Sequence, residues 1–179
     1  MKNKLLLPIA AIFLSITAFN ASATLKNTLS IGYAQSQVKI DGDKVDEDPK
    51  GFNIKYDRKI DNGFGIIGSF VYNNKKYNCQ DEDGKNTEHS DVSYYLISGG
   101  PSYRFNEYIN AYGLIGTSVF NVNYKDIYEE HRENKVSISY GLGLQINPIP
   151  NVAIDASYEY SKLDDLKFGT WVLGVGYRF

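Results

Sequence analysis

Apolar and polar residues alternate with a period of two along most of this chain, a pattern that predicts β-strands. The last segment shows the pattern most clearly, because one of its faces is fully apolar. That face consists of Trp171, Leu173, Val175, Tyr177 and Phe179. Seven earlier segments are also strand candidates, at residues 28–37, 51–59, 64–73, 93–105, 109–122, 138–146 and 152–161. The chain is therefore predicted to be an all-β protein with eight strands.

The connections between these predicted strands alternate between short and long. The short ones contain the Asn, Gly and Pro residues typical of turns, at residues 61–63, 106–107 and 147–151. The long ones are strongly polar, at roughly residues 38–50, 74–91, 123–135 and 162–168. An antiparallel meander then has its long loops at one end and its short turns at the other. Residues 109–122 are apolar or glycine on both faces, so the pattern does not orient that strand.

An eight-stranded meander can close into a barrel, which leaves no strand edge exposed. A soluble lipocalin-like barrel would keep its apolar face inside, whereas an outer-membrane barrel turns it towards lipid. Here the polar face is rich in glycine and serine, which suit a narrow interior. It also holds charged residues that can pair inside, namely Lys55, Asp57, Arg104, Asp155, Glu159 and Arg178. The pattern favours an eight-stranded antiparallel up-and-down transmembrane β-barrel with four long extracellular loops and three short periplasmic turns.

The first 23 residues are typical of a secretory signal peptide. Lys2 and Lys4 precede a mostly apolar stretch at residues 5–19, which is shorter than the ~20 residues that a spanning helix needs. Residues 21–23 are Ala-Ser-Ala, a small-x-small cleavage site. We expect cleavage between Ala23 and Thr24, which leaves residues 24–179 as a barrel domain exported to the cell outer membrane.

Six segments of the strand regions form a recognisable set, at residues 32–36, 51–56, 67–70, 100–104, 140–148 and 169–179. With this set the chain resembles the Ail/Lom family of outer-membrane proteins. The resemblance implies an eight-stranded barrel without enzymatic activity. Family members are associated with adhesion to host cells or matrix, invasion and resistance to complement, and others have a less defined role. It also implies that Tyr177 and the terminal Phe179 are part of the signal recognised by the barrel-assembly machinery.

Candidate catalytic and metal-binding residues are few. His89 and His131 are the only histidines, and both fall in long loops. His89 is followed by Ser90 and Asp91, but adjacency in sequence does not make a catalytic triad, because geometry defines one. Two histidines are also too few for a three-histidine zinc site. We expect no catalytic residue, no metal and no cofactor, and an outer-membrane hydrolase is the third-ranked alternative.

The remaining acidic and thiol groups have structural interpretations. Asp155 and Glu159 share one strand face, and a filled eight-strand lumen would keep substrate away from them. The acidic runs at residues 41–48 and 81–84 lack the spacing of an EF-hand. Cys79 has no second cysteine with which to form an internal disulfide.

Loop composition is the remaining guide to partners. The net charge of −2 argues against nucleic acid, and the acidic excess of the loops argues against a heparin-like polyanion. Basic-aromatic spots occur at Lys75, Lys76, Tyr77, Tyr124, Lys125 and Tyr128. They fit either contacts with a partner or, as the simpler interpretation, an upper aromatic girdle.

We expect a monomer that contacts outer-membrane lipid, lipopolysaccharide, the barrel-assembly machinery and host cell-surface, matrix or complement proteins. The predicted function is adhesion, invasion or serum resistance. The alternative is a structural or stress-related barrel without a dedicated host ligand, and a soluble periplasmic barrel ranks last.

Overall fold

The computed structural model describes residues 25–40, 43–44, 48–80, 86–125, 130–163 and 166–179. The predicted signal peptide and its cleavage site at Ala23 and Thr24 lie outside these ranges. The strands are β1 Asn27–Ile40, β2 Asp43–Lys44, β3 Lys50–Asp61, β4 Phe64–Gln80, β5 Asn86–Arg104, β6 Ile109–Lys125, β7 Glu130–Ile149, β8 Val152–Leu163 and β9 Leu166–Arg178. Within the described ranges, no helix is long and apolar enough to cross a bilayer.

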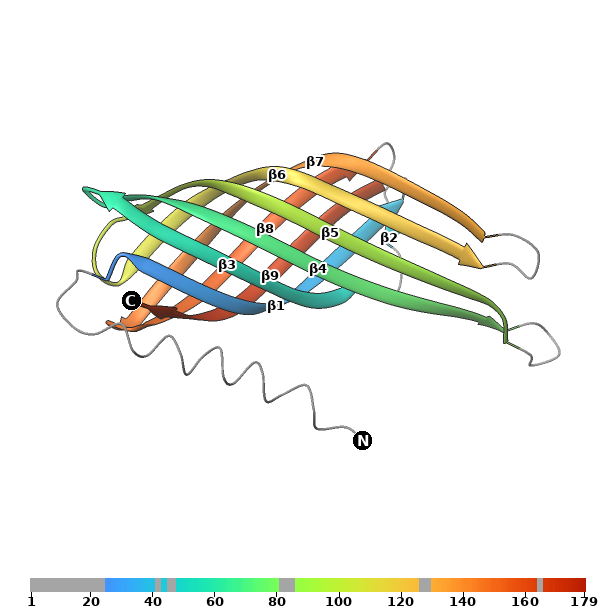
Figure 1. Ribbon diagram of the computed structural model, residues 1–179, viewed down its shortest axis with the longest axis horizontal. Coiled ribbons are helices and arrows are strands. Elements are labelled where there is room, and N and C mark those ends of the chain that lie inside the picture. The colour runs from blue at the N-terminus through green and yellow to red at the C-terminus, as the bar shows by residue number, and fades with distance from the viewer. Residues whose placement is uncertain (1–24, 41–42, 45–47, 81–85, 126–129, 164–165) are drawn as a thin grey trace, which may run out of the picture.

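The long strands form a closed antiparallel barrel (Figure 1). Each strand from β3 to β8 pairs with the next, and β1 pairs with both β3 and β9. The closing seam runs from the pair Thr28 and Arg178 to the pair Ile40 and Leu166. The two-residue β2 only extends the sheet beside the end of β1. The predicted eight-stranded barrel is therefore confirmed, and closure satisfies the backbone groups that an open edge would leave unpaired.

The first short turn shows how local sequence sets the strand pairing. Asn62 and Gly63 connect β3 to β4, and both have positive φ, at 45° and 85°. This backbone is typical of a two-residue turn whose twist matches the flanking strands, and Asn-Gly is the pair best suited to it. The start of β1 and the C-terminal Phe179 lie at the same end of the barrel as the short turns, where Arg178 donates its backbone N–H to Asn151 O at 2.9 Å.

Burial along the strands is inverted relative to a soluble protein. On β3, Lys55 and Asp57 are each 1% exposed, whereas their neighbours Ile54 and Tyr56 are 42% and 43% exposed. On β7, Leu142 is 74% exposed and Ser139 is fully buried. The polar face therefore lines the lumen and the apolar face points outwards, as the alternation predicted.

The strand that the sequence left unoriented, β6, places Tyr112 and Leu114 in the lumen and Ile115 outside. Both inward residues pack with Ile67 of β4. A second apolar cluster fills the part of the lumen nearer the long connections, and it consists of Ala34, Val71, Tyr94, Leu96, Phe168 and Val172. Residues 109–122 are apolar on both faces because this strand supplies side chains to the lipid side and to the lumen.

The predicted extents of the long loops were wrong, most clearly for residues 74–91 and 123–135. β4 continues to Gln80 and β5 starts at Asn86, while β6 continues to Lys125 and β7 starts at Glu130. The connections predicted at 38–50 and 162–168 are shortened in the same way by β1, β2, β8 and β9. Strands outside the bilayer have water on both sides, so they lose the apolar alternation by which a strand is recognised.

Candidate functional site

The centre of the lumen holds an ion pair between β3 and β8, which are not neighbours in the sheet. Lys55 Nζ is paired with Asp155 Oδ1, and both side chains are at most 1% exposed. Lys55 also donates to Ser157 Oγ at 2.7 Å, and Tyr112 donates its hydroxyl to Asp155 Oδ2 at 2.8 Å. The Lys55 ammonium lies 5.5 Å from the centre of the Tyr112 ring. Each charge is thus compensated by a counter-charge and hydrogen bonds, which burial requires.

A second group of charges lies nearer the short turns. Lys59 Nζ is 3.5 Å from Asp57 Oδ2 and donates to Asn110 Oδ1 at 2.6 Å. The Asp57 carboxylate accepts hydrogen bonds from Ser102 at 2.5 Å and from Asn110 at 3.0 Å. Asn110 donates in turn to Gln145 Oε1 at 2.8 Å. Lys59 lies on the same face of β3 as Lys55 and Asp57, but it was not among the predicted network residues.

The other predicted network residues have different partners. Glu159 accepts hydrogen bonds from Ser98 at 2.7 Å and from Ser69 at 3.3 Å. Arg104 Nη1 donates to the backbone oxygen of Leu25 at 3.0 Å, and Arg178 Nη1 donates to that of Glu107 at 3.4 Å. Lys55 is thus paired with Asp155. The Glu159 carboxylate instead accepts hydrogen bonds from two hydroxyls, and each arginine donates to a backbone carbonyl.

Glycines in the lumen wall make room for these large side chains. Gly143 is the register partner of Tyr112, and a Cβ at Gly143 would overlap the Tyr112 ring. A Cβ at Gly141 would meet the Glu159 side chain at 2.6 Å. The two glycines therefore allow Tyr112 and Glu159 to reach their partners inside an eight-stranded barrel, whose interior has space only for side chains.

Aromatic residues form two rows on the outer face. Near the short turns, Phe64 and Tyr103 lie with their ring centres 4.8 Å apart. Towards the long connections, Tyr72 lies 5.8 Å from Phe52 and 5.0 Å from Tyr95. Phe64 and Tyr72 are both on β4, and eight residues of strand correspond to about 26 Å. A strand tilt of about 35–45° reduces this to about 18–21 Å along the bilayer normal, somewhat less than the ~25 Å apolar band that aromatic girdles flank.

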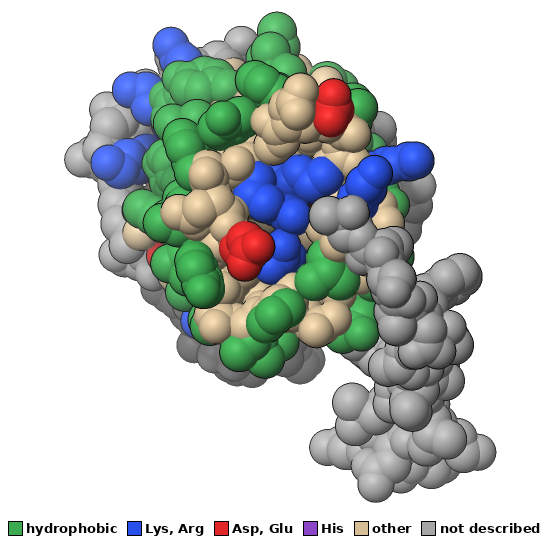
Figure 2. All heavy atoms as spheres, turned by 90° about the vertical axis from the view of Figure 1, so that its left-hand side faces the viewer, with side chains coloured by type: hydrophobic (Ala, Val, Ile, Leu, Met, Phe, Trp, Pro, Cys, Tyr) green, Lys and Arg blue, Asp and Glu red, His purple; other side chains and the backbone are tan. Residues whose placement is uncertain are grey.

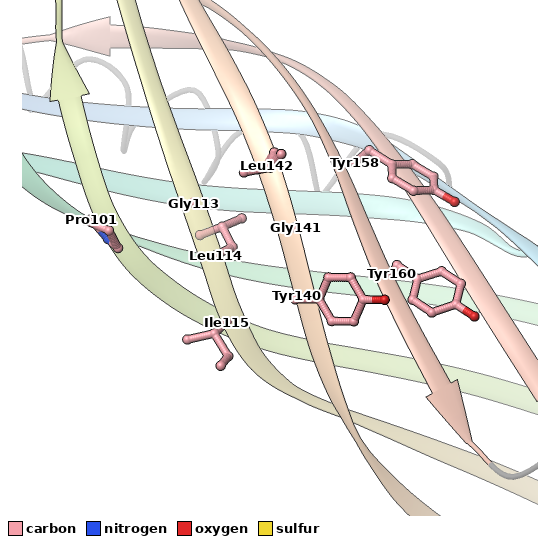
Figure 3. Close-up of a pocket in the computed structure, with 9 residues that line it drawn as sticks. All are labelled: Pro101, Gly113, Leu114, Ile115, Tyr140, Gly141, Leu142, Tyr158 and Tyr160. Carbon is pink, nitrogen blue, oxygen red and sulfur yellow. The ribbon is translucent and has the colours of Figure 1, made fainter.

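A shallow apolar groove lies on the outer face over β5 to β8 (Figure 3). It has a volume of about 650 Å³ and lies where Pro101 and Gly113 leave little side chain between Ile115 and Leu142. Tyr140 and two further tyrosines border it on the side of β8. Because Ile115, Tyr140 and Leu142 belong to the lipid-facing surface, this groove fits acyl chains.

Beyond the barrel rim, β4 to β7 continue as one projecting sheet of two hairpins (Figure 1). In this sheet Tyr77 pairs with Ser90, Ser90 pairs with Tyr124, and Tyr124 pairs with His131. Tyr77 and Tyr124, which were predicted as partner contacts in two separate connections, therefore lie at the same level of the strand register.

Other predicted contact residues occupy neighbouring positions of this sheet. Lys75 and Lys76 of β4 pair with Val92 and Asp91 of β5, and Lys125 pairs with His89. Tyr128 lies outside the described residues. At the opposite end, the rings of Tyr177 and Phe179 stack with centres 6.3 Å apart.

A closed barrel with an apolar exterior, two aromatic rows and a lumen of hydrogen-bonded polar side chains defines a β-barrel protein of the outer membrane. The family model described as outer membrane protein beta-barrel domain matches residues 6–179. Within that class, the chain belongs to the Ail/Lom family.

Individual relatives match along the whole chain. The chain is 48% identical over 179 residues to the attachment invasion locus protein of Yersinia enterocolitica, with all of both chains covered. It is 38% identical over 182 residues to outer membrane protein X of Escherichia coli strain K12, again over both full lengths. A crystal structure of Ail from Yersinia pestis in complex with the heparin analogue sucrose octasulfate superposes with a TM-score of 0.79. That comparison has 46% identity and covers 86% of this chain and 98% of the other.

Proposed function

We propose that this protein is a surface adhesin that binds host cell-surface, matrix or complement proteins through the projecting sheet of β4 to β7. The sheet itself is the observation on which the proposal rests. β5 has 19 residues and β7 has 20, whereas a tilted strand needs only ~9–11 residues to cross a bilayer. The excess length holds a binding surface away from the membrane.

The edges of the projecting sheet supply a means of binding. β3 pairs with β4 only as far as Asn74, and β8 pairs with β7 only from Ser139 onwards. Among the described residues, β4 beyond Asn74 and β7 before Ser139 therefore have a neighbouring strand on one side only. Such edges offer backbone N–H and C=O groups to an extended segment of another protein, the mode known as β-augmentation.

The names of relatives agree with this proposal. Attachment and invasion describe the Yersinia enterocolitica protein to which the chain is 48% identical. No step in this function needs catalysis, and we propose that the protein acts without enzymatic activity. The register that brings Tyr77, Tyr124 and three lysines into one sheet favours a partner surface at these residues over an upper girdle, because Tyr77 is five residues beyond the aromatic row at Tyr72.

Hairpin shortening in a non-adherent bacterial strain tests the proposal. One variant joins Lys75 to Val92, and another joins Val122 to Glu133, each through Asn-Gly, because these residues are register partners. The double variant should lose cell binding to background level while it keeps the heat-modifiable mobility of a folded barrel. The matched control places Asn-Gly at residues 164–165, between β8 and β9, and should bind normally. Unchanged binding by the folded double variant would refute the proposed site.

A second candidate function is binding of sulfated or phosphorylated polyanions, including the phosphates of lipopolysaccharide. Lys39 pairs with Lys167, which pairs with Lys162, so three exposed lysines form a row across β1, β9 and β8. The loop composition, taken as a sum, predicted that a polyanion would be disfavoured. The row of three lysines favours a polyanion at this place, and the related Ail of Yersinia pestis has been crystallised with sucrose octasulfate.

Titration with sucrose octasulfate tests this candidate directly. The variant K39A/K162A/K167A should lose most of its affinity and most of the salt dependence of binding, since exposed charges act through screened electrostatics. The control K26A/R58A removes two exposed cations near the short turns and should bind as the unmodified protein does. Equal affinity of both variants would exclude the lysine row.

A further inference from the structure

Three cationic side chains converge in the lumen at the end with the short turns. They are Lys59 of β3, Arg104 of β5 and Arg178 of β9. Lys59 is 8% exposed and Arg178 is 4% exposed, and Arg104 is partly buried. Lys59 experiences repulsion from both guanidinium groups, and the two guanidinium groups repel each other. Figure 2 shows lysine and arginine side chains gathered at the centre of this end.

The described residues around this cluster compensate only part of its charge. Asp57 is the buried carboxylate beside it, and its oxygens also accept hydrogen bonds from Ser102 and Asn110. The terminal nitrogens of the two arginines bond to neutral backbone carbonyls. Glu107 also attracts Arg178, but its side chain is exposed to solvent, which screens this charge. Three positive charges thus face one buried negative charge, whereas Lys55 deeper in the lumen is matched by Asp155.

Buried hydrogen-bond donors at the same place have no partner among the described residues. They are Arg104 Nε, Arg178 Nε and Gln145 Nε2. Gln145 is 2% exposed, and its Oε1 is already bonded to Asn110, so its amide nitrogen remains available. Buried polar groups in folded proteins are normally satisfied, and unsatisfied donors call for an acceptor. Hydrogen-bond donors without an acceptor, next to positive charge that is only partly compensated, are the features of an anion-binding site.

We propose that this mouth of the lumen is a binding site for an oxyanion of the phosphate class, held by Lys59, Arg104 and Arg178. Guanidinium groups match the geometry of phosphate oxygens, and the lysine supplies a point charge. The buried acceptor Asn147 Oδ1 has no partner among the described residues, and Asn147 shares the Glu107 carbonyl with Arg178. This Asn147 oxygen is placed to accept a hydrogen bond from the hydroxyl of a monohydrogen phosphate. The anion is either free phosphate or the headgroup of a phospholipid.

The test uses the full mature protein in an uncharged detergent and follows the side-chain N–H resonances of both arginine Nε groups. Inorganic phosphate, added at constant ionic strength with chloride as the balancing ion, should shift these resonances saturably. R178Q should weaken the affinity roughly tenfold, since a hydrogen bond between charged groups is lost. R58Q, which removes an exposed cation of the same end, should not.

Heat-modifiable mobility identifies folded variants, and R104Q replaces R178Q if the latter does not fold. A second arm uses nanodiscs of phosphatidylglycerol in phosphate-free buffer. Arginine Nε–H resonances that are shifted in the nanodiscs relative to the phosphate-free detergent sample, and that added inorganic phosphate does not move further, would identify a headgroup. Resonances that shift only when inorganic phosphate is added would identify a free anion. The absence of saturable shifts in both arms, or equal weakening by R58Q, would overturn the proposal.

Discussion

The two faces of the barrel wall follow opposite rules within single strands. Ile54 and Lys55 are adjacent in sequence, yet Ile54 is 42% exposed towards lipid and Lys55 is 1% exposed in the lumen. The lipid face needs apolar surface and no specific partner. In the lumen, each large polar group needs both space and a bonding partner, as Lys55, Asp155 and Tyr112 show. The lumen should therefore be much more sensitive to small changes than the lipid face.

The largest predicted effect comes from breaking the central ion pair. Lys55→Met leaves Asp155 buried without its counter-charge, and the free energy of unfolding should fall by about 3–5 kcal/mol. The double variant K55M/D155L removes both charges and should recover most of this loss. Urea unfolding in lipid vesicles measures both, with the single tryptophan, Trp171, as the fluorescent reporter. A double variant no more stable than Lys55→Met would contradict the role of the pair.

Charge on the lipid face should cost somewhat less and should depend on depth. Leu142→Arg places a cation on the outer face of β7, with an expected loss of about 2–4 kcal/mol near the bilayer midplane. Ile149→Arg makes the same change at the end of the same strand, where the expected loss is about 0–1 kcal/mol. The same unfolding experiment compares them. Equal losses at the two positions would mean that β7 does not cross the bilayer as described.

The smallest effect should distinguish two glycines on opposite faces. Gly143→Val inserts a side chain into the Tyr112 ring, and overpacking of this kind costs about 1–3 kcal/mol. Gly113→Val points towards lipid, where the nearest atom to an added Cβ is Leu142 Cδ2 at 4.0 Å. Its expected cost is below about 1 kcal/mol. If Gly113→Val were the more damaging change, the proposed difference between the two faces would be wrong.

The sequence predicted those parts of the fold that depend on one face being apolar. The alternation identified the barrel strands and correctly placed Trp171, Leu173 and Val175 on one outward apolar face. It failed where strands leave the bilayer, as at residues 74–80 of β4, because no apolar face is needed there. It also left β6 unoriented, since that strand contributes apolar side chains to both sides of the wall.

The pairings inside the lumen could be predicted only in part. The polar alternation identified which charges turn inwards, including Lys55 and Asp155. It could not identify their partners, because strand tilt and stagger decide which residues of non-adjacent strands meet at one height. The apolar context of Tyr112 likewise gave no signal that its hydroxyl bonds to Asp155. Gly143 opposite Tyr112 is a usable signal only once the strand register is known.

The account depends on the apolar face of the wall being in contact with acyl chains. Its most direct test measures the accessibility of single nitroxide labels on the outer face of β7, at positions 138, 142 and 146, in a Cys79→Ser background in lipid vesicles. The account predicts frequent collisions with dissolved oxygen and few with a water-soluble nickel chelate, with the greatest contrast at position 142. A label at position 142 that collides more with the chelate than with oxygen would show a water-facing surface and contradict the account.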